Sequence, residues 1–169
     1  MGIQKKINCL LICIILSPIN LFADDGLFIG MGLGSDGINA LRISKEQSKG
    51  KIFDTNIQRY VEYGLNFWNG DNNTDSKSSN VSLTYSHVLK KDIFENLNIN
   101  SGIGFAVLSD DKIGRRNLGA TLQFESRLGF EHSSSSTKSA VHLFHYSNAG
   151  TAASNSGLNI FMINFSHLF

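Results

Sequence analysis

Apolar side chains recur at every second position through most of this chain, which is the period of a β-strand with one apolar face. In residues 27–34, leucine, isoleucine and methionine alternate with phenylalanine and three glycines. The same alternation returns seven times, with polar or turn-forming residues between the stretches. The eight stretches are 27–34, 41–43, 61–67, 81–86, 97–107, 117–128, 139–148 and 157–169. The pattern predicts an all-β protein of eight antiparallel strands.

The character of the second face distinguishes two kinds of β-protein. A transmembrane barrel has an apolar exterior and a polar interior, whereas a soluble sandwich or lipocalin places its apolar face inward. Gln123, Glu125 and Arg127 share one face of a predicted strand, where a carboxylate and a guanidinium can pair inside a barrel. The last stretch ends on Phe169, and this alternating aromatic ending resembles the C-terminal signal of bacterial outer-membrane barrels. We therefore expect an eight-stranded antiparallel transmembrane β-barrel of the outer-membrane type, with the soluble fold as the alternative.

The first 23 residues have the pattern of a secretory signal peptide. Lys5 and Lys6 precede an apolar run at 7–16, and a small residue, Ala23, ends the segment before two aspartates. The apolar run is too short to span about 30 Å of hydrocarbon as a transmembrane anchor, which is the other interpretation. We expect cleavage after Ala23 and a single barrel domain over residues 24–169. Cys9 and Cys13 lie within the removed segment, so the remaining chain carries no thiol for a disulfide or metal site.

The charge of the remaining chain is close to neutral. Without Lys5 and Lys6, 13 basic residues stand against 14 acidic ones. There is no basic excess of the kind that binds nucleic acid, and nucleic acid is not an expected partner. After residue 23 no stretch approaches 18 consecutive apolar residues, so the sequence predicts no transmembrane helix there.

An even number of strands puts both chain ends on the periplasmic side. The connections at 69–80, 109–116 and 149–156 are then external, and those at 90–96 and 131–138 are periplasmic. His145 and Ser147 consequently fall at the outer end of the seventh strand, at the depth of the external leaflet. Arg115 and Arg116, in an external connection, are candidates for contact with a phosphate headgroup, with solvated loop residues as the alternative.

His145 and Ser147 lie two residues apart on a strand and point to the same face, so the imidazole can serve as base for the hydroxyl. Asn159 shares its face with the apolar residues of the last strand, and an antiparallel hairpin can bring it beside His145. Asn148 and Gly150 follow at the strand end, where N–H groups can stabilise an oxyanion. Polar residues near a membrane interface cost little, which is the non-catalytic alternative. No cluster has metal-ligand spacing, and no metal or cofactor is expected.

The hexapeptide His145–Gly150, in the penultimate strand of a short signal-bearing barrel, resembles the lipid A 3-O-deacylase family (PagL). The likeness includes the strand count and the Gly157-Leu158-Asn159 segment, and elsewhere it is one of pattern. The resemblance implies an eight-stranded outer-membrane esterase that hydrolyses the 3-O-linked acyl chain of lipid A, with no cofactor. It implies Ser147 as nucleophile, His145 as base, and Asn148 and Gly150 in the oxyanion region. Lipopolysaccharide in the outer membrane is the implied partner, and homodimerisation is left open.

One position departs from the family pattern, which has glutamate as its third catalytic member where this chain has Asn159. No Asp or Glu follows Glu131, so the final hairpin holds no substitute carboxylate. The spacing is also similar to outer-membrane phospholipase A, which looks like a Ser-His-Asn esterase on a larger barrel. We predict an active enzyme with Asn159 as the residue that orients His145. The alternatives are a non-enzymatic adhesin or structural barrel, and an esterase acting on phospholipids.

Overall fold

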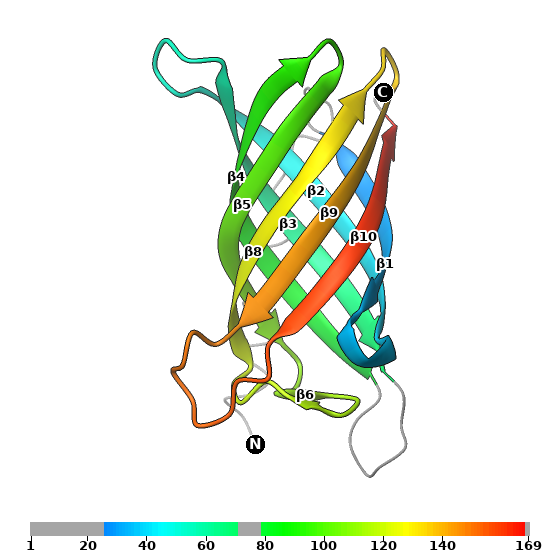
Figure 1. Cartoon of the computed structure of the whole chain (residues 1–169), viewed down its shortest axis with the longest axis vertical. Helices are drawn as coiled ribbons and strands as arrows, with labels where there is room; N and C mark the ends of the chain where they lie inside the picture. The colour runs from blue at the N-terminus through cyan, green and yellow to red at the C-terminus, as the bar shows by residue number, and fades with distance from the viewer. Residues whose placement is uncertain (1–25, 71–78, 168–169) are drawn as a thin grey trace, which may run out of the picture.

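Eight long antiparallel strands close into a barrel (Figure 1). The computed structural model describes residues 26–70 and 79–167. The strands are β1 (Leu27–Gly34), β2 (Asn39–Lys51), β3 (Ile57–Asn69), β4 (Ser79–Phe94), β5 (Leu97–Leu108), β8 (Leu122–Ser133), β9 (Thr137–Ser147) and β10 (Leu158–His167). β1 pairs with both β2 and β10, which leaves the barrel sheet without a free edge. The predicted eight-stranded barrel is confirmed, while the predicted signal peptide and Phe169 lie outside the described residues.

Three short elements of secondary structure lie at one end of the barrel. A 3-10 helix, η1 (Ser35–Gly37), follows β1, and β6 (Lys112–Ile113) pairs with β7 (Arg116–Asn117) in a small hairpin between β5 and β8. The connections after β1, β5 and β9 gather at this end, which we call the outer end (Figure 1). No helix within residues 26–70 and 79–167 is long and apolar enough to cross a membrane.

Several predicted strand boundaries were wrong. In each case the pattern along the sequence did not show that a side chain is buried inside the barrel. Lys90 and Glu131, assigned to periplasmic connections, lie within β4 and β8 and are buried. Charged residues resemble a loop in a linear sequence, but here they pair across the lumen. Leu118, assigned to the outward face of a strand, lies in a connection and is fully buried with Ile113 beneath the outer end. That strand begins at Leu122 instead.

The exterior of the barrel is apolar. Successive outward residues of one strand, such as Leu27, Ile29, Met31 and Leu33 in β1, are 44–68% exposed. Large exposed apolar side chains also occur on the other seven strands. A continuous wall of this kind cannot be solvated by water without a large hydrophobic cost, whereas a bilayer solvates it directly. The wall is therefore a membrane-facing surface, as the alternation predicts.

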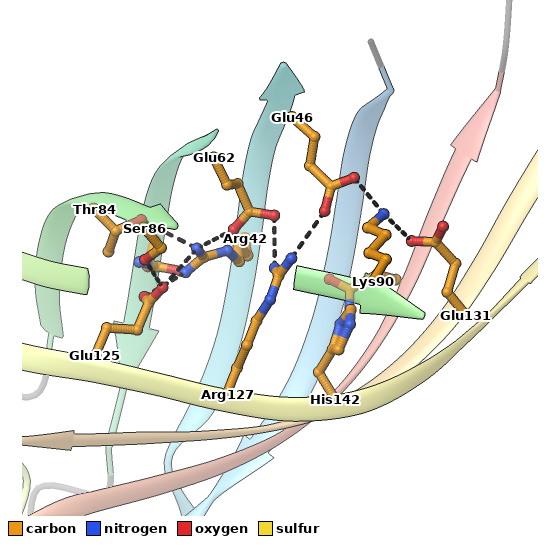
Figure 2. Close-up of polar contacts among 12 residues, drawn as sticks. Arg42, Glu46, Glu62, Thr84, Ser86, Lys90, Glu125, Arg127, Glu131 and His142 are labelled. Atoms are coloured by element: carbon orange, nitrogen blue, oxygen red, sulfur yellow. Dashed lines mark hydrogen bonds and ion pairs between the residues drawn. The ribbon is translucent and has the colours of Figure 1, made fainter. Parts of the chain in front are cut away.

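The interior is filled by a network of buried ion pairs (Figure 2). Arg42 contacts Glu62 at 2.5 Å and Glu125 at 3.0 Å, and Arg127 contacts Glu62 at 2.7 Å. Arg127 also contacts Glu46 at 2.8 Å. Lys90 bridges Glu46, at 2.5 Å, and one more carboxylate, Glu131, at 2.6 Å. These groups come from β2, β3, β4 and β8, so the network connects facing walls of the barrel. The predicted inward placement of Gln123, Glu125 and Arg127 is confirmed.

Replacing Lys90 by methionine should destabilise the barrel. The change leaves two buried carboxylates without their shared cation, and breaking a buried pair in this way costs about 3 kcal/mol or more. The free energy of unfolding in detergent, measured by urea titration, should fall by that amount. Lys91→Met is the matched control, because Lys91 is the next residue of β4 and is exposed on the outside. Equal stability loss in both variants would contradict a role for the Lys90 pairs.

Candidate active site

His145 and Asn159 meet on the outer wall of the barrel, near its outer end. They are direct register partners on β9 and β10. Both side chains are exposed, on the same faces as Leu143 and Phe161. The His145 Nδ1 and Asn159 Oδ1 atoms are 2.7 Å apart. Because a carboxamide oxygen only accepts, this contact places the imidazole proton on Nδ1 and leaves Nε2 unprotonated in the neutral ring.

Ser147 ends β9 on the same outward face as His145. It is half-buried, and its register partner on the neighbouring strand β8 is Phe124. Within residues 26–70 and 79–167, the Ser147 hydroxyl and His145 Nε2 form no hydrogen bond. The strand geometry thus puts the predicted hydroxyl, imidazole and carboxamide on one wall, with the imidazole–carboxamide contact already made. Catalytic hydrogen bonds are often long before substrate binds, and a serine hydroxyl moves by rotation about a single bond.

Asn148 and Gly150 organise the connection that follows Ser147. The Asn148 side chain is buried, and its Nδ2 donates to Leu118 O at 2.8 Å and Ser154 O at 2.7 Å. The Gly150 backbone N–H donates to Asn148 Oδ1 at 2.8 Å. Gly150 has φ of +79°, which an L-residue seldom adopts, so glycine suits this turn. These N–H groups follow the predicted nucleophile in the chain. Each already donates a hydrogen bond to an acceptor within the connection.

Arg116 braces the same region from the neighbouring connection. Its Nη1 donates to Ser156 O at 2.8 Å and to Gly157 O at 2.5 Å. Its Nε lies 2.9 Å from the carboxylate of Asp36, in the 3-10 helix η1. Arg116 is thus a positioned structural cation, neither a solvated loop residue nor a free phosphate ligand, whereas Arg115 is exposed. Its role depends on a meeting of three connections, which no local pattern in the sequence indicates.

Tyr146, between the two site residues of β9, anchors the strand from inside. Its ring contacts Trp68 edge to face with centroids 4.8 Å apart, and it is 1% exposed. Its hydroxyl accepts a hydrogen bond from Arg42 Nη1 at 3.2 Å. The ion-pair network therefore reaches the back of the strand that carries the site. The alternation does predict that Tyr146 points inward, but its partners on β2 and β3 could not be found from the sequence.

Gly157 lies directly before β10 and beside the imidazole of His145. A Cβ at this position would lie 3.4 Å from His145 Cε1, and the residue has φ of +59°. Gly157→Ala should therefore strain the backbone by about 1–2 kcal/mol and place a methyl group in van der Waals contact with the ring. We expect esterase activity to fall about tenfold. Gly50→Ala is the control, because Gly50 has φ of +77° with nothing within 4 Å of its Cβ. Equal activity in both variants would mean that the contact with His145 is immaterial.

The arrangement suits acyl transfer chemistry. A hydroxyl, a base and a group that orients the base are the minimum for a serine nucleophile. Among the residues that the structure describes, no group of three His, Cys, Asp or Glu side chains could hold a metal ion. The remaining histidine of β9, His142, points inward as its register predicts, and its Nδ1 lies 2.9 Å from Asn164 Nδ2.

Fold and site together define an outer-membrane-type barrel with a serine, a histidine and an asparagine on its membrane-facing wall. The family model for lipid A 3-O-deacylase (PagL) matches residues 37–167. The chain belongs to this family.

Comparison with individual proteins supports the assignment. The chain is 30% identical over 106 residues to "Lipid A deacylase PagL" of Pseudomonas aeruginosa (strain PAO1), and this match covers 62% of the chain and 61% of that relative. In fold it is similar to the crystal structure of the outer membrane enzyme PagL, with a TM-score of 0.74 and 24% identity. That alignment covers 84% of this chain and 97% of the other. A de novo designed transmembrane β-barrel aligns with a TM-score of 0.54 at 13% identity, over 85% and 92% of the two chains.

Proposed function

We propose that the protein is a lipid A 3-O-deacylase, a serine esterase that hydrolyses the acyl chain at the 3-position of lipid A. The observation that carries the proposal is the 2.7 Å contact between His145 Nδ1 and Asn159 Oδ1 on the outward wall, with Ser147 on the same face. This contact fixes the imidazole in the tautomer whose Nε2 can accept a proton, and a hydroxyl lies on the same face of the strand, which is what a serine esterase requires. Family membership supplies the substrate class.

In the proposed reaction Ser147 Oγ attacks the ester carbonyl carbon while His145 Nε2 takes the hydroxyl proton. Asn159 Oδ1 keeps accepting from Nδ1–H and holds the ring as it becomes positive. The tetrahedral intermediate then expels the sugar oxygen, which receives the proton from Nε2. Water, deprotonated by the same nitrogen, attacks the carbonyl carbon of the acyl-enzyme. The bond from that carbon to Ser147 Oγ then breaks, Oγ takes the proton from Nε2, and a free fatty acid leaves. Each proton that His145 accepts is thus returned within one half-reaction.

The connection after Ser147 supplies the proposed oxyanion region. The Gly150 N–H now donates to the neutral Asn148 Oδ1. A developing oxyanion is a stronger acceptor than a carboxamide oxygen, so this N–H can turn to the intermediate as charge forms. The two bonds from Asn148 Nδ2 to backbone carbonyls keep the connection in place during that exchange.

The proposed location is the outer leaflet of the outer membrane, after cleavage of the signal peptide behind Ala23. Ser147 is the last residue of β9, and β9 ends at the outer end of the barrel (Figure 1). We infer that a lipid reaches this residue laterally from the membrane. Arg115, exposed in an outer connection, remains a candidate for phosphate contact. Ser147, His145 and Asn159 belong to one chain, so the mechanism needs no second copy, and homodimerisation stays a prediction. The mechanism uses no cofactor.

Incubating the purified barrel with lipid A, and separately with phospholipid, tests this function. Mass spectrometry of the products should show lipid A lighter by one acyl chain, with phospholipid intact. Cleavage of phospholipid alone would favour a phospholipase-type hydrolase. No cleavage of either lipid by the folded barrel would favour a non-enzymatic outer-membrane protein.

A further inference from the structure

A groove of about 710 Å³ lies on the outside of the barrel, beside the proposed active site. It crosses five neighbouring strands, β10, β1, β2, β3 and β4. Its floor follows one register row, that is, a line of residues paired directly across neighbouring strands. Every member of this row is apolar: Ile163, Met31, Leu41, Phe67 and Val81. A row of this kind is a binding surface for a hydrocarbon chain.

The groove has a polar rim on its outer side. The adjacent register row also lines the groove, and on β2, β3 and β4 it consists of Asn39, Asn69 and Ser79. These residues lie at the outer ends of their strands. Carboxamide and hydroxyl groups above an apolar floor suit a molecule with a polar headgroup and a hydrocarbon tail, held with its head toward the outer end.

The groove begins on β10, the strand that carries Asn159, and extends away from the nucleophile. Phe161 and its register partner Leu33 belong to the rim row and line the groove. Asn159 is the next outward residue of β10 before Phe161. Ser147 lies on β9, on the opposite side of β10 from β1 to β4. The groove covers β10 to β4, which are one to five strands from β9 when counted through β10. With strands about 4.8 Å apart, it therefore lies roughly 5–24 Å around the wall from the strand of the nucleophile.

We propose that this groove binds an acyl chain that the substrate retains, while the chain to be cleaved lies at Ser147. The inference rests on the proposed function, because it assigns a second contact to the same lipid. A lipid whose sugar headgroup carries several chains can place one ester at Ser147 and another chain over β1 to β4 at the same time. The second contact fixes which ester reaches the nucleophile, so the groove determines the position of cleavage.

The test fills the groove at its centre and compares two kinds of substrate. Leu41→Trp places an indole in the middle of the apolar row. Ile43→Trp is the matched control, because Ile43 lies on the same strand and face, is also 39% exposed, and is outside the groove. The substrates are lipid A and a single-chain nitrophenyl ester. In Leu41→Trp we expect kcat/KM to fall about tenfold or more for lipid A, as for other lost apolar pocket contacts. Hydrolysis of the single-chain ester should change less than about twofold.

Other outcomes would overturn the proposal. If both tryptophan variants hydrolyse lipid A as the wild type does, the groove holds only bulk membrane lipid. If Leu41→Trp also loses activity on long single-chain esters, the groove holds the cleaved chain instead. Binding of lipid A to Ser147→Ala, with and without Leu41→Trp, gives a readout that needs no turnover. This measurement distinguishes the two proposals. If the protein binds lipid A in a way that depends on Leu41 but does not hydrolyse it, the groove proposal holds and the esterase proposal fails.

Discussion

Ser147→Ala should abolish deacylation while leaving the barrel intact. The variant removes the only atom that the proposed mechanism uses to attack the ester, and loss of a serine nucleophile lowers kcat by about 10⁴-fold or more. Lipid A extracted from cells producing the wild-type protein should lack one acyl chain, and lipid A from cells producing the variant should keep it. Ser147 is half-buried at a strand end, so losing one hydroxyl should cost little stability.

Ser139→Ala is the matched control for this experiment. Ser139 lies on the same strand as Ser147 and on the same outward face, but near the opposite end of β9. This variant should deacylate lipid A as the wild type does. Retention of folding in both variants can be checked by the heat-dependent shift of the barrel in gel mobility. Unchanged deacylation by folded Ser147→Ala would remove Ser147 from the mechanism and, with it, the serine esterase proposal.

Asn159→Ala should lower kcat/KM about 10²- to 10³-fold. The substitution removes the acceptor of the 2.7 Å contact from His145 Nδ1, so the ring loses its fixed tautomer and its orientation toward Ser147. Asn159→Asp restores an acceptor of the same size and adds a charge that stabilises the imidazolium. A charge near the membrane interface costs only about 0–1 kcal/mol, so the barrel should tolerate it. We expect Asn159→Asp to match or exceed the wild-type rate.

The pair of variants distinguishes orientation of the base from packing. Alanine and aspartate both remove the carboxamide N–H₂, and only aspartate keeps an acceptor for the imidazole. In steady-state kinetics on purified lipid A, kcat/KM should be far below the wild-type value for Asn159→Ala and equal to or above it for Asn159→Asp. Equal and wild-type rates for both would show that His145 needs no partner on β10, and the carboxamide would then have no catalytic role.

Alternation along the strands predicted eight strands with one apolar face, because a side-chain period of two fixes which residues share a face. The charged second face and the aromatic C-terminal ending then favoured a membrane barrel over a soluble β-fold. The same parity put His145, Ser147 and Asn159 on the apolar outward face, as the structure has them. Parity gives no information about partners far apart in the chain. Lys90 and Glu131 therefore resemble loop residues in the sequence, although they pair with each other inside the barrel, and Leu118 resembles a strand residue, although it lies in a connection and packs in the buried apolar cluster.

The sequence alone thus determined the strand count, the two faces and the residues of the candidate site, since each follows from local geometry that every β-strand shares. Only the tertiary structure decided that Arg116 braces the connections around Gly157 and that Arg42 holds Tyr146 from within. It alone also showed that five apolar side chains from five strands line one groove. These features depend on closure of the sheet, which brings β1 beside β10 and sets the register between strands that are distant in sequence.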